Sequence, residues 1–263
     1  MKIISSILFL IFCEALLVFP GGIVEIVIKP AFCSGNENLI SIIAFSTSGI
    51  VVLLGLKLFF NDIFLRIRDL LNVSIKNLAI FLGSILAMII LFSLVVFLSN
   101  KINLIHIRVA SDRQFDFLGI LLLFIMSLVV AVVEEIVYRG ADLSYLQRKF
   151  NPWIAILLIS IFFSIGHVQY TGVLSYITAF IFSVLASIIV IKTNTLFMAI
   201  GLHCGWNFAY SYNNLFFNLD SKIIPSWGKL FEFFEIGILT LVLLLFLCYY
   251  DKRVQTNENR DEK

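Results

Sequence analysis

Three groups of residues that include polar side chains, each containing a pair spaced four positions apart, lie inside apolar stretches of the chain. They are Glu134, Glu135 and Arg139; Phe163 and His167; and His203 and Asn207. Residues at i and i+4 share one face of a helix, so each group would present its side chains together. Carboxylates, imidazoles and an amide gathered from three helices could activate a water molecule and stabilise an oxyanion, which is the chemistry of peptide-bond hydrolysis.

The two adjacent glutamates are predicted to have different roles. Glu135 and Arg139 lie four positions apart, so they can neutralise each other in a medium of low dielectric constant. Glu134 points about 100° away from Glu135 around a helix, and Arg139 is less well placed to pair with it. The pattern therefore predicts one structural carboxylate, Glu135, and one that is free for chemistry, Glu134.

Hydrolysis of a peptide bond needs a base for the attacking water, donors for the oxyanion and a proton for the leaving amine. Glu134 is suited to be the general base, and His167 would position or share the same water. His203 and Asn207, on one helix face, are suited to donate hydrogen bonds to the oxyanion.

The same side chains could instead bind a metal ion. Glu134, His167 and His203 form a set of one carboxylate and two imidazoles, which is typical of catalytic Zn²⁺ sites that keep one position open for water. A zinc-bound water and a glutamate-activated water without a metal are both compatible with these residues.

In this order, and each in an apolar stretch, the three groups resemble the motifs of the CPBP family. This family comprises the CAAX proteases and bacteriocin-processing enzymes, also called Abi proteins, and includes the Ras-converting enzyme. The resemblance covers residues 117–215 and holds at all seven positions. It implies a helical intramembrane peptidase that acts on a hydrophobic, membrane-anchored or prenylated peptide at a site open to the cytoplasm or its interface. The family is commonly labelled metalloprotease, whereas its Ras-converting members imply a glutamate-activated water without an obligatory metal.

Other interpretations compete with the peptidase. Glutamates at a helix end can extend to the membrane interface, and a lone histidine in a membrane helix is more often a packing residue than a catalyst. Buried glutamates and histidines also form proton relays in transporters, although paired helix breaks and inverted repeats would then be expected. A non-catalytic immunity or scaffold protein is a third alternative. The presence of three complete groups favours the peptidase.

The composition identifies the surroundings of these helices. Hydrophobic residues make up 60% of the 263 residues and charged residues 14%, against roughly 45–50% and 25% in soluble proteins. This indicates an integral protein of the lipid bilayer. The net charge of +2 is too balanced for a nucleic-acid-binding surface. The four cysteines show no CxxC spacing, so neither a disulfide framework nor a zinc ribbon is expected.

The hydropathy pattern predicts an all-α, polytopic helical bundle in the cell membrane. The expected spans are 3–19, 39–60, 78–98, 117–138, 153–168, 173–191, 196–215 and 230–250. The first is interpreted as a retained helix and not as a signal peptide. Lys and Arg are more numerous in loops on the side of the termini, which predicts that both termini are cytoplasmic. We expect one domain over 1–250, an amphipathic interfacial helix at 62–73 and a polar tail at 251–263.

The depths of the polar groups add a further expectation. If the fourth span ended at Tyr138, Glu134 would lie only about 6 Å from its end, whereas His167 would lie about 21 Å along the fifth. The two would then not meet. We therefore expect the fourth helix to continue past Arg139, with Asn151 and Pro152 opening the fifth helix. A polar cavity is expected among the fourth, fifth and seventh spans. The role of Glu14, a charge within the first span, is left open.

Overall fold

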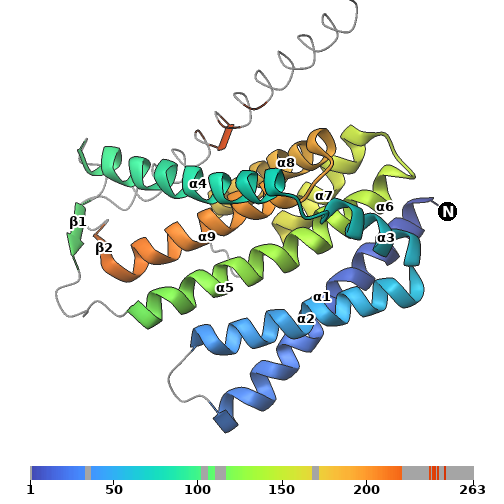
Figure 1. Cartoon of the computed structure of the whole chain (residues 1–263), viewed down its shortest axis with the longest axis horizontal. Helices are drawn as coiled ribbons and strands as arrows, with labels where there is room; N and C mark the ends of the chain where they lie inside the picture. The colour runs from blue at the N-terminus through green and yellow to red at the C-terminus, as the bar shows by residue number, and fades with distance from the viewer. Residues whose placement is uncertain are drawn as a thin grey trace, which may run out of the picture.

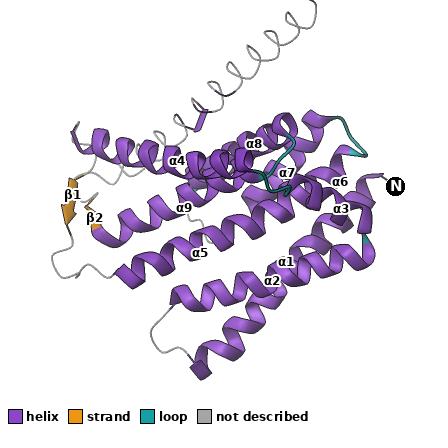
Figure 2. Ribbon diagram, in the orientation of Figure 1, coloured by secondary structure: helices purple, strands orange, loops and turns teal. Residues whose placement is uncertain are grey.

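The computed structural model describes residues 2–32, 37–101, 106–109, 117–167 and 172–220, together with positions 237, 239, 240, 242 and 246. Within these ranges the chain is a bundle of helices, most of which run along the long axis of the molecule (Figure 1). Figure 2 shows that helix accounts for nearly all of the described secondary structure. The predicted all-α class is confirmed.

The helices follow the chain in the expected order. They are α1 (Lys2–Phe32), α2 (Glu37–Phe59), α3 (Asn61–Leu70), α4 (Ile75–Lys101), α5 (Phe117–Glu135), the π-helix η1 (Ile136–Asp142), α6 (Leu143–Gln147), α7 (Pro152–Gly166), α8 (Val173–Thr193) and α9 (Phe197–Phe216). Helix α9 packs between α4 and α5, α1 packs on α2, and α7 packs on α8.

Five segments of the described chain are long and apolar enough to cross a membrane. They are Lys2–Val24, Asn38–Phe59, Ile75–Lys101, Phe117–Gln147 and Val173–Thr193. The protein is therefore a multi-pass membrane protein. Helix α7, with 15 residues, is shorter than a full span, and α9 carries more polar residues. Apart from five positions, the predicted span 230–250 lies outside the described residues, as does the whole of the tail 251–263. The number of eight spans stays a prediction.

One short strand pair accompanies the helices. Strands β1 (His106–Val109) and β2 (Phe217–Asp220) pair antiparallel, with His106 opposite Asp220. Strand β1 follows α4 and β2 follows α9, so the pair joins the ends of two helices that pack together. Four residues are too few to show an alternating pattern in the sequence, so the pair has no sequence signal.

The predicted continuation of the fourth helix is present. Helix α5 runs without a break through η1 into α6, and no interruption occurs at Gly140. The seven residues of η1 are all buried. A π-helix has one extra residue per turn compared with an α-helix, and such turns are frequent at functional sites. Asn151 caps α7 by accepting a hydrogen bond from the Ile154 amide, with Pro152 at the first turn, as expected.

Two glycines allow α9 to approach α4 closely. A Cβ atom at Gly201 would lie 2.6 Å from the Phe81 carbonyl oxygen, and one at Gly205 would lie 2.7 Å from the Ile85 carbonyl oxygen. This spacing of two glycines four positions apart is a recurrent device for close packing of membrane helices. His203 lies between the two glycines in the sequence, so this contact fixes the depth and rotation of the helix that carries it.

The predicted amphipathic helix is α3, but its apolar face meets protein and not lipid. Ile63, Ile67 and Leu70 are almost completely buried and belong to the main core. The Leu70 carbonyl accepts hydrogen bonds from the Leu196 amide at 3.1 Å and from the Thr195 hydroxyl at 3.2 Å. Helix α3 thereby holds the start of α9 in place.

Candidate active site

A fully buried ion pair stands at the centre of the bundle. Arg139 Nη1 donates to Glu135 Oε1 at 3.0 Å, and both side chains are 0% exposed. The predicted pairing is therefore present. The guanidinium lies 4.5 Å from the ring centroid of Phe163 and 5.7 Å from that of Phe182. Aromatic faces attract a cation, so Phe163 of the second motif supports the arginine of the first.

Glu135 also contacts the third motif. Its Oε1 atom lies 2.8 Å from His203 Nδ1, so one carboxylate oxygen receives both Arg139 and His203. The carboxylate is paired with a cation and can only accept, which makes His203 Nδ1 the donor. Glu135 was predicted to be a partner of Arg139; the structure adds that it orients a candidate catalytic imidazole.

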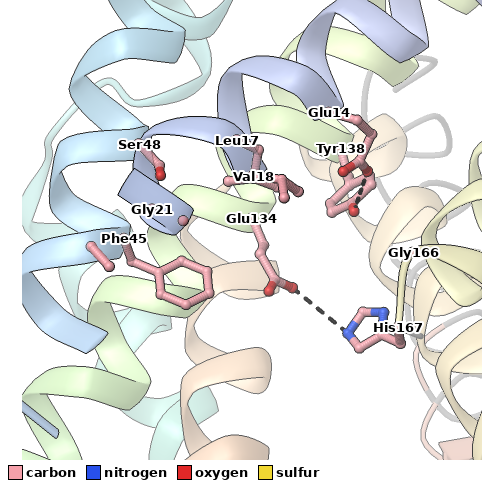
Figure 3. A pocket seen from close by; sticks show the side chains of 12 residues that line it. Glu14, Leu17, Val18, Gly21, Phe45, Ser48, Glu134, Tyr138, Gly166 and His167 are labelled. Carbon is pink, nitrogen blue, oxygen red and sulfur yellow. Dashed lines mark hydrogen bonds and ion pairs between the residues drawn. The ribbon is translucent and has the colours of Figure 1, made fainter. Parts of the chain in front are cut away.

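Glu134 is turned away from this pair toward two imidazoles. Glu134 Oε2 lies 3.7 Å from His203 Nε2 and 3.9 Å from His167 Nε2. Figure 3 shows the Glu134 carboxylate and the His167 ring facing each other across the pocket. Both distances are longer than a hydrogen bond, and Glu134 Oε2 is buried with no hydrogen-bond partner among the described residues. Glu134 therefore faces both imidazoles without a direct hydrogen bond to either.

Both histidines are held so that Nε2 faces Glu134. His167 Nδ1 lies 2.7 Å from the Phe163 carbonyl oxygen, which can only accept, so Nδ1 is the donor there too. In a neutral ring Nε2 then carries a lone pair, and in an imidazolium it carries a proton. The backbone of α7 orients one ring and Glu135 orients the other.

Asn207 joins the site through a small cavity of about 40 Å³. His167, His203 and Asn207 all line it, together with Phe182 and Trp206. A space of this size holds a water molecule or a carbonyl oxygen. The structure therefore brings all seven motif residues into one region.

The larger cavity, of about 300 Å³, lies elsewhere than expected. Glu134 and His167 line it from α5 and the end of α7, but much of its wall comes from α1 and α2. We expected a cavity among the fourth, fifth and seventh spans; the seventh, α9, lines the smaller cavity instead. The position of the larger cavity could not be predicted, because the sequence of a long apolar helix shows little of which neighbouring helix each face contacts.

Two residues in this cavity were not assigned to the site from the sequence. Glu14 of α1 and Tyr138 of η1 both line it, and the Tyr138 hydroxyl donates to Glu14 Oε1 at 2.5 Å. Glu14 was noted from the sequence as a charge inside a span, with its role left open, and the structure places it on the wall of this cavity. Tyr138 gave no signal beyond its place between the residues of the first motif.

The donor set suits zinc in its chemistry but not in its spacing. Ligands held tetrahedrally at 2.0–2.1 Å from a zinc ion lie about 3.3 Å from one another. The separations from Glu134 to His203 and His167 are 3.7 and 3.9 Å. Within the described residues no three histidine, cysteine or acidic side chains are close enough together to hold a metal. As arranged, the residues do not fit the ion.

Comparison with known proteins agrees with the motifs. Residues 116–209 match the family model described as Type II CAAX prenyl endopeptidase Rce1-like. The matched segment is less than half of the chain and contains all seven motif residues. No curated protein matches the chain. The resemblance inferred from the three motifs is confirmed over residues 116–209, where the chain is similar to the Rce1-like type II CAAX prenyl endopeptidases.

Proposed function

We propose that the chain hydrolyses a peptide bond of a hydrophobic, membrane-associated or prenylated peptide, using a water molecule activated by Glu134. The match of residues 116–209 to a CAAX endopeptidase family model supports an intramembrane peptidase in general. The observation that carries the finer proposal is the position of Glu134 Oε2. It is a buried carboxylate oxygen facing two imidazoles at 3.7 and 3.9 Å, on the wall of a cavity of about 300 Å³.

The first step is activation of water. A water molecule between Glu134 Oε2 and His167 Nε2 can contact both, because two hydrogen bonds of ordinary length bridge a gap of 3.9 Å. Glu134 takes one proton as the oxygen attacks the substrate carbonyl carbon, and His167 accepts a hydrogen bond from the other. The product of this step is a tetrahedral oxyanion and a protonated Glu134.

The second step is stabilisation of the oxyanion. Asn207 and His203 line the small cavity next to His167, where the Asn207 amide donates to the developing negative charge. His203, whose Nδ1 is held by Glu135, can donate from Nε2 in its imidazolium form. Donors that are already oriented stabilise an oxyanion without reorganising. Protonated Glu134 then passes its proton to the leaving amine, and the C–N bond breaks.

The experiment compares the full chain with Glu134→Gln, reconstituted in lipid nanodiscs and assayed on a set of hydrophobic peptides. Removing a general base lowers the rate about 10²–10⁴-fold, and we expect the amide variant to fold because it keeps the shape of the side chain. Asp69→Asn is the matched control, on the exposed side of α3, and should cleave at the wild-type rate. Equal cleavage by wild type and Glu134→Gln would exclude the peptidase mechanism. A proton relay or a non-catalytic protein would cleave no peptide at all.

A further inference from the structure

The cavity beside Glu134 contains a second carboxylate that the hydrolytic mechanism does not use. Glu14 lines this cavity from α1, the first helix of the chain, outside the segment matched by the family model. In Figure 3 it lies beside Tyr138, across the opening from Phe45. Its Oε1 atom receives the Tyr138 hydroxyl at 2.5 Å, so the carboxylate has a fixed position on the cavity wall.

Glu14 and Glu134 line the same cavity, and Tyr138 lines it with them. Among the residues that the structure describes, the lining of this cavity includes no lysine or arginine. Arg139 is turned into the core, where Glu135 and the ring of Phe163 engage it. Two ionised carboxylates in a space of low dielectric constant repel each other, so one of them takes up a proton unless a cation enters between them.

The remaining wall is apolar. Leu17 and Val18 of α1 and Phe45 of α2 line the same cavity. A lysine or arginine side chain has this dual character, since its methylene stem packs on apolar surface while its charged end reaches a carboxylate. A volume of about 300 Å³ suits one long side chain and a short length of peptide and is at the lower end of ligand pockets.

We propose that Glu14, oriented by Tyr138, forms a substrate subsite that selects a lysine or arginine side chain next to the scissile bond. The inference rests on the proposed function, because the Glu134 side of the cavity is where the bond would be cut. It also implies that a substrate carboxylate in this cavity is disfavoured, since it would meet two groups of like charge.

The test uses the full chain in lipid nanodiscs and hydrophobic reporter peptides that differ at one position. Lysine, methionine and glutamate are compared there, and both neighbours of the cleaved bond are scanned. We expect wild type to prefer lysine over methionine about ten-fold in kcat/KM, as a charge-assisted hydrogen bond provides, and to cleave the glutamate peptide most slowly. In Glu14→Gln the ratio of lysine to methionine should fall to near one, while in Asp69→Asn it should stay at the wild-type value.

Two outcomes would overturn the subsite: wild type with no preference for lysine, or a Glu14→Gln variant that keeps it. If Glu14→Gln is not recovered folded, Tyr138→Phe decides. Losing the hydroxyl frees Glu14 from its hydrogen bond, so an unchanged ratio in that variant would contradict the proposal.

Different results would contradict the proposed function. These are cleavage that persists in Glu134→Gln, or the absence of cleavage of any peptide by wild type. In the second case, binding of the same labelled peptides to wild type, measured by fluorescence anisotropy, still tests the subsite. Tighter binding of the lysine peptide that is lost in Glu14→Gln supports it, and equal binding of all three peptides overturns it.

Discussion

His203 donates its Nδ1 hydrogen to Glu135 Oε1 at 2.8 Å, and the same oxygen receives Arg139 at 3.0 Å. This oxygen links two helices whose motif residues are 68 positions apart in the sequence. The first and third motifs are thus one hydrogen-bonded unit, in which the ion pair of α5 and η1 sets the rotation of an imidazole on α9. Histidines whose Nδ1 is held by a carboxylate present Nε2 in a defined direction, here toward Glu134.

We predict that Glu135→Ala lowers the free energy of unfolding by about 3–5 kcal/mol. The substitution leaves the fully buried Arg139 without its partner, and an unpaired buried charge has a cost of this size. Reversible unfolding in mild detergent micelles, followed by helical circular dichroism, measures the change. Asp69→Ala removes an acid from an exposed pair with Arg68 and should leave stability unaltered. A fully stable Glu135→Ala protein would show that the division of roles between the two glutamates is wrong.

Much of this arrangement follows from the sequence, and the reasons are local. Residues four positions apart on a helix must meet, so Glu135 with Arg139, and Phe163 with His167, could be paired by spacing alone. The length of the apolar stretches predicted the long helices. The mismatch in depth between Glu134 and His167 predicted that the helix from Phe117 continues to Gln147.

Features that depend on distant packing could not be predicted. Tyr138 and Glu14 are 124 positions apart, and nothing in an apolar stretch specifies which helix its one charge faces. The π-helical turns of η1 depend on packing around all seven buried residues and not on a residue type. The placement of the larger cavity against α1 and α2 has the same origin.

We predict that Asn207→Ala lowers kcat about 10²–10³-fold with little change in KM. The amide is assigned to the oxyanion, which exists only in the transition state, and loss of one such donor has this effect. Steady-state kinetics on a cleaved peptide measure both constants. Asn77→Ala, which removes an amide that donates to the Asn72 carbonyl on the exposed side of the protein, is the control. A rise in KM at constant kcat would place Asn207 in substrate binding instead.

We predict that Gly205→Ala both destabilises the protein and lowers its activity. The new methyl group would lie 2.7 Å from the Ile85 carbonyl oxygen, so α9 must move away from α4 and carry His203 with it. Overpacking of this kind costs about 1–3 kcal/mol. Gly83→Ala on α4 meets no atom within 4 Å, and it should keep activity and stabilise its helix by up to about 1 kcal/mol. Thermal unfolding and peptide cleavage are measured on both variants; identical behaviour would show that the glycine contact does not position the site.

The last prediction concerns the metal. Because Glu134 lies 3.7 and 3.9 Å from the two imidazoles, farther than a shared zinc ion allows, we expect hydrolysis to continue in protein freed of metal by a strong chelator. Elemental analysis establishes the zinc content of the sample, and cleavage is measured before and after treatment. In this case Glu134 itself supplies the base, so Glu134→Gln should abolish a rate that the chelator leaves intact. Loss of cleavage on chelation and its return on adding zinc would instead show that the three side chains close by about half an ångström around an ion.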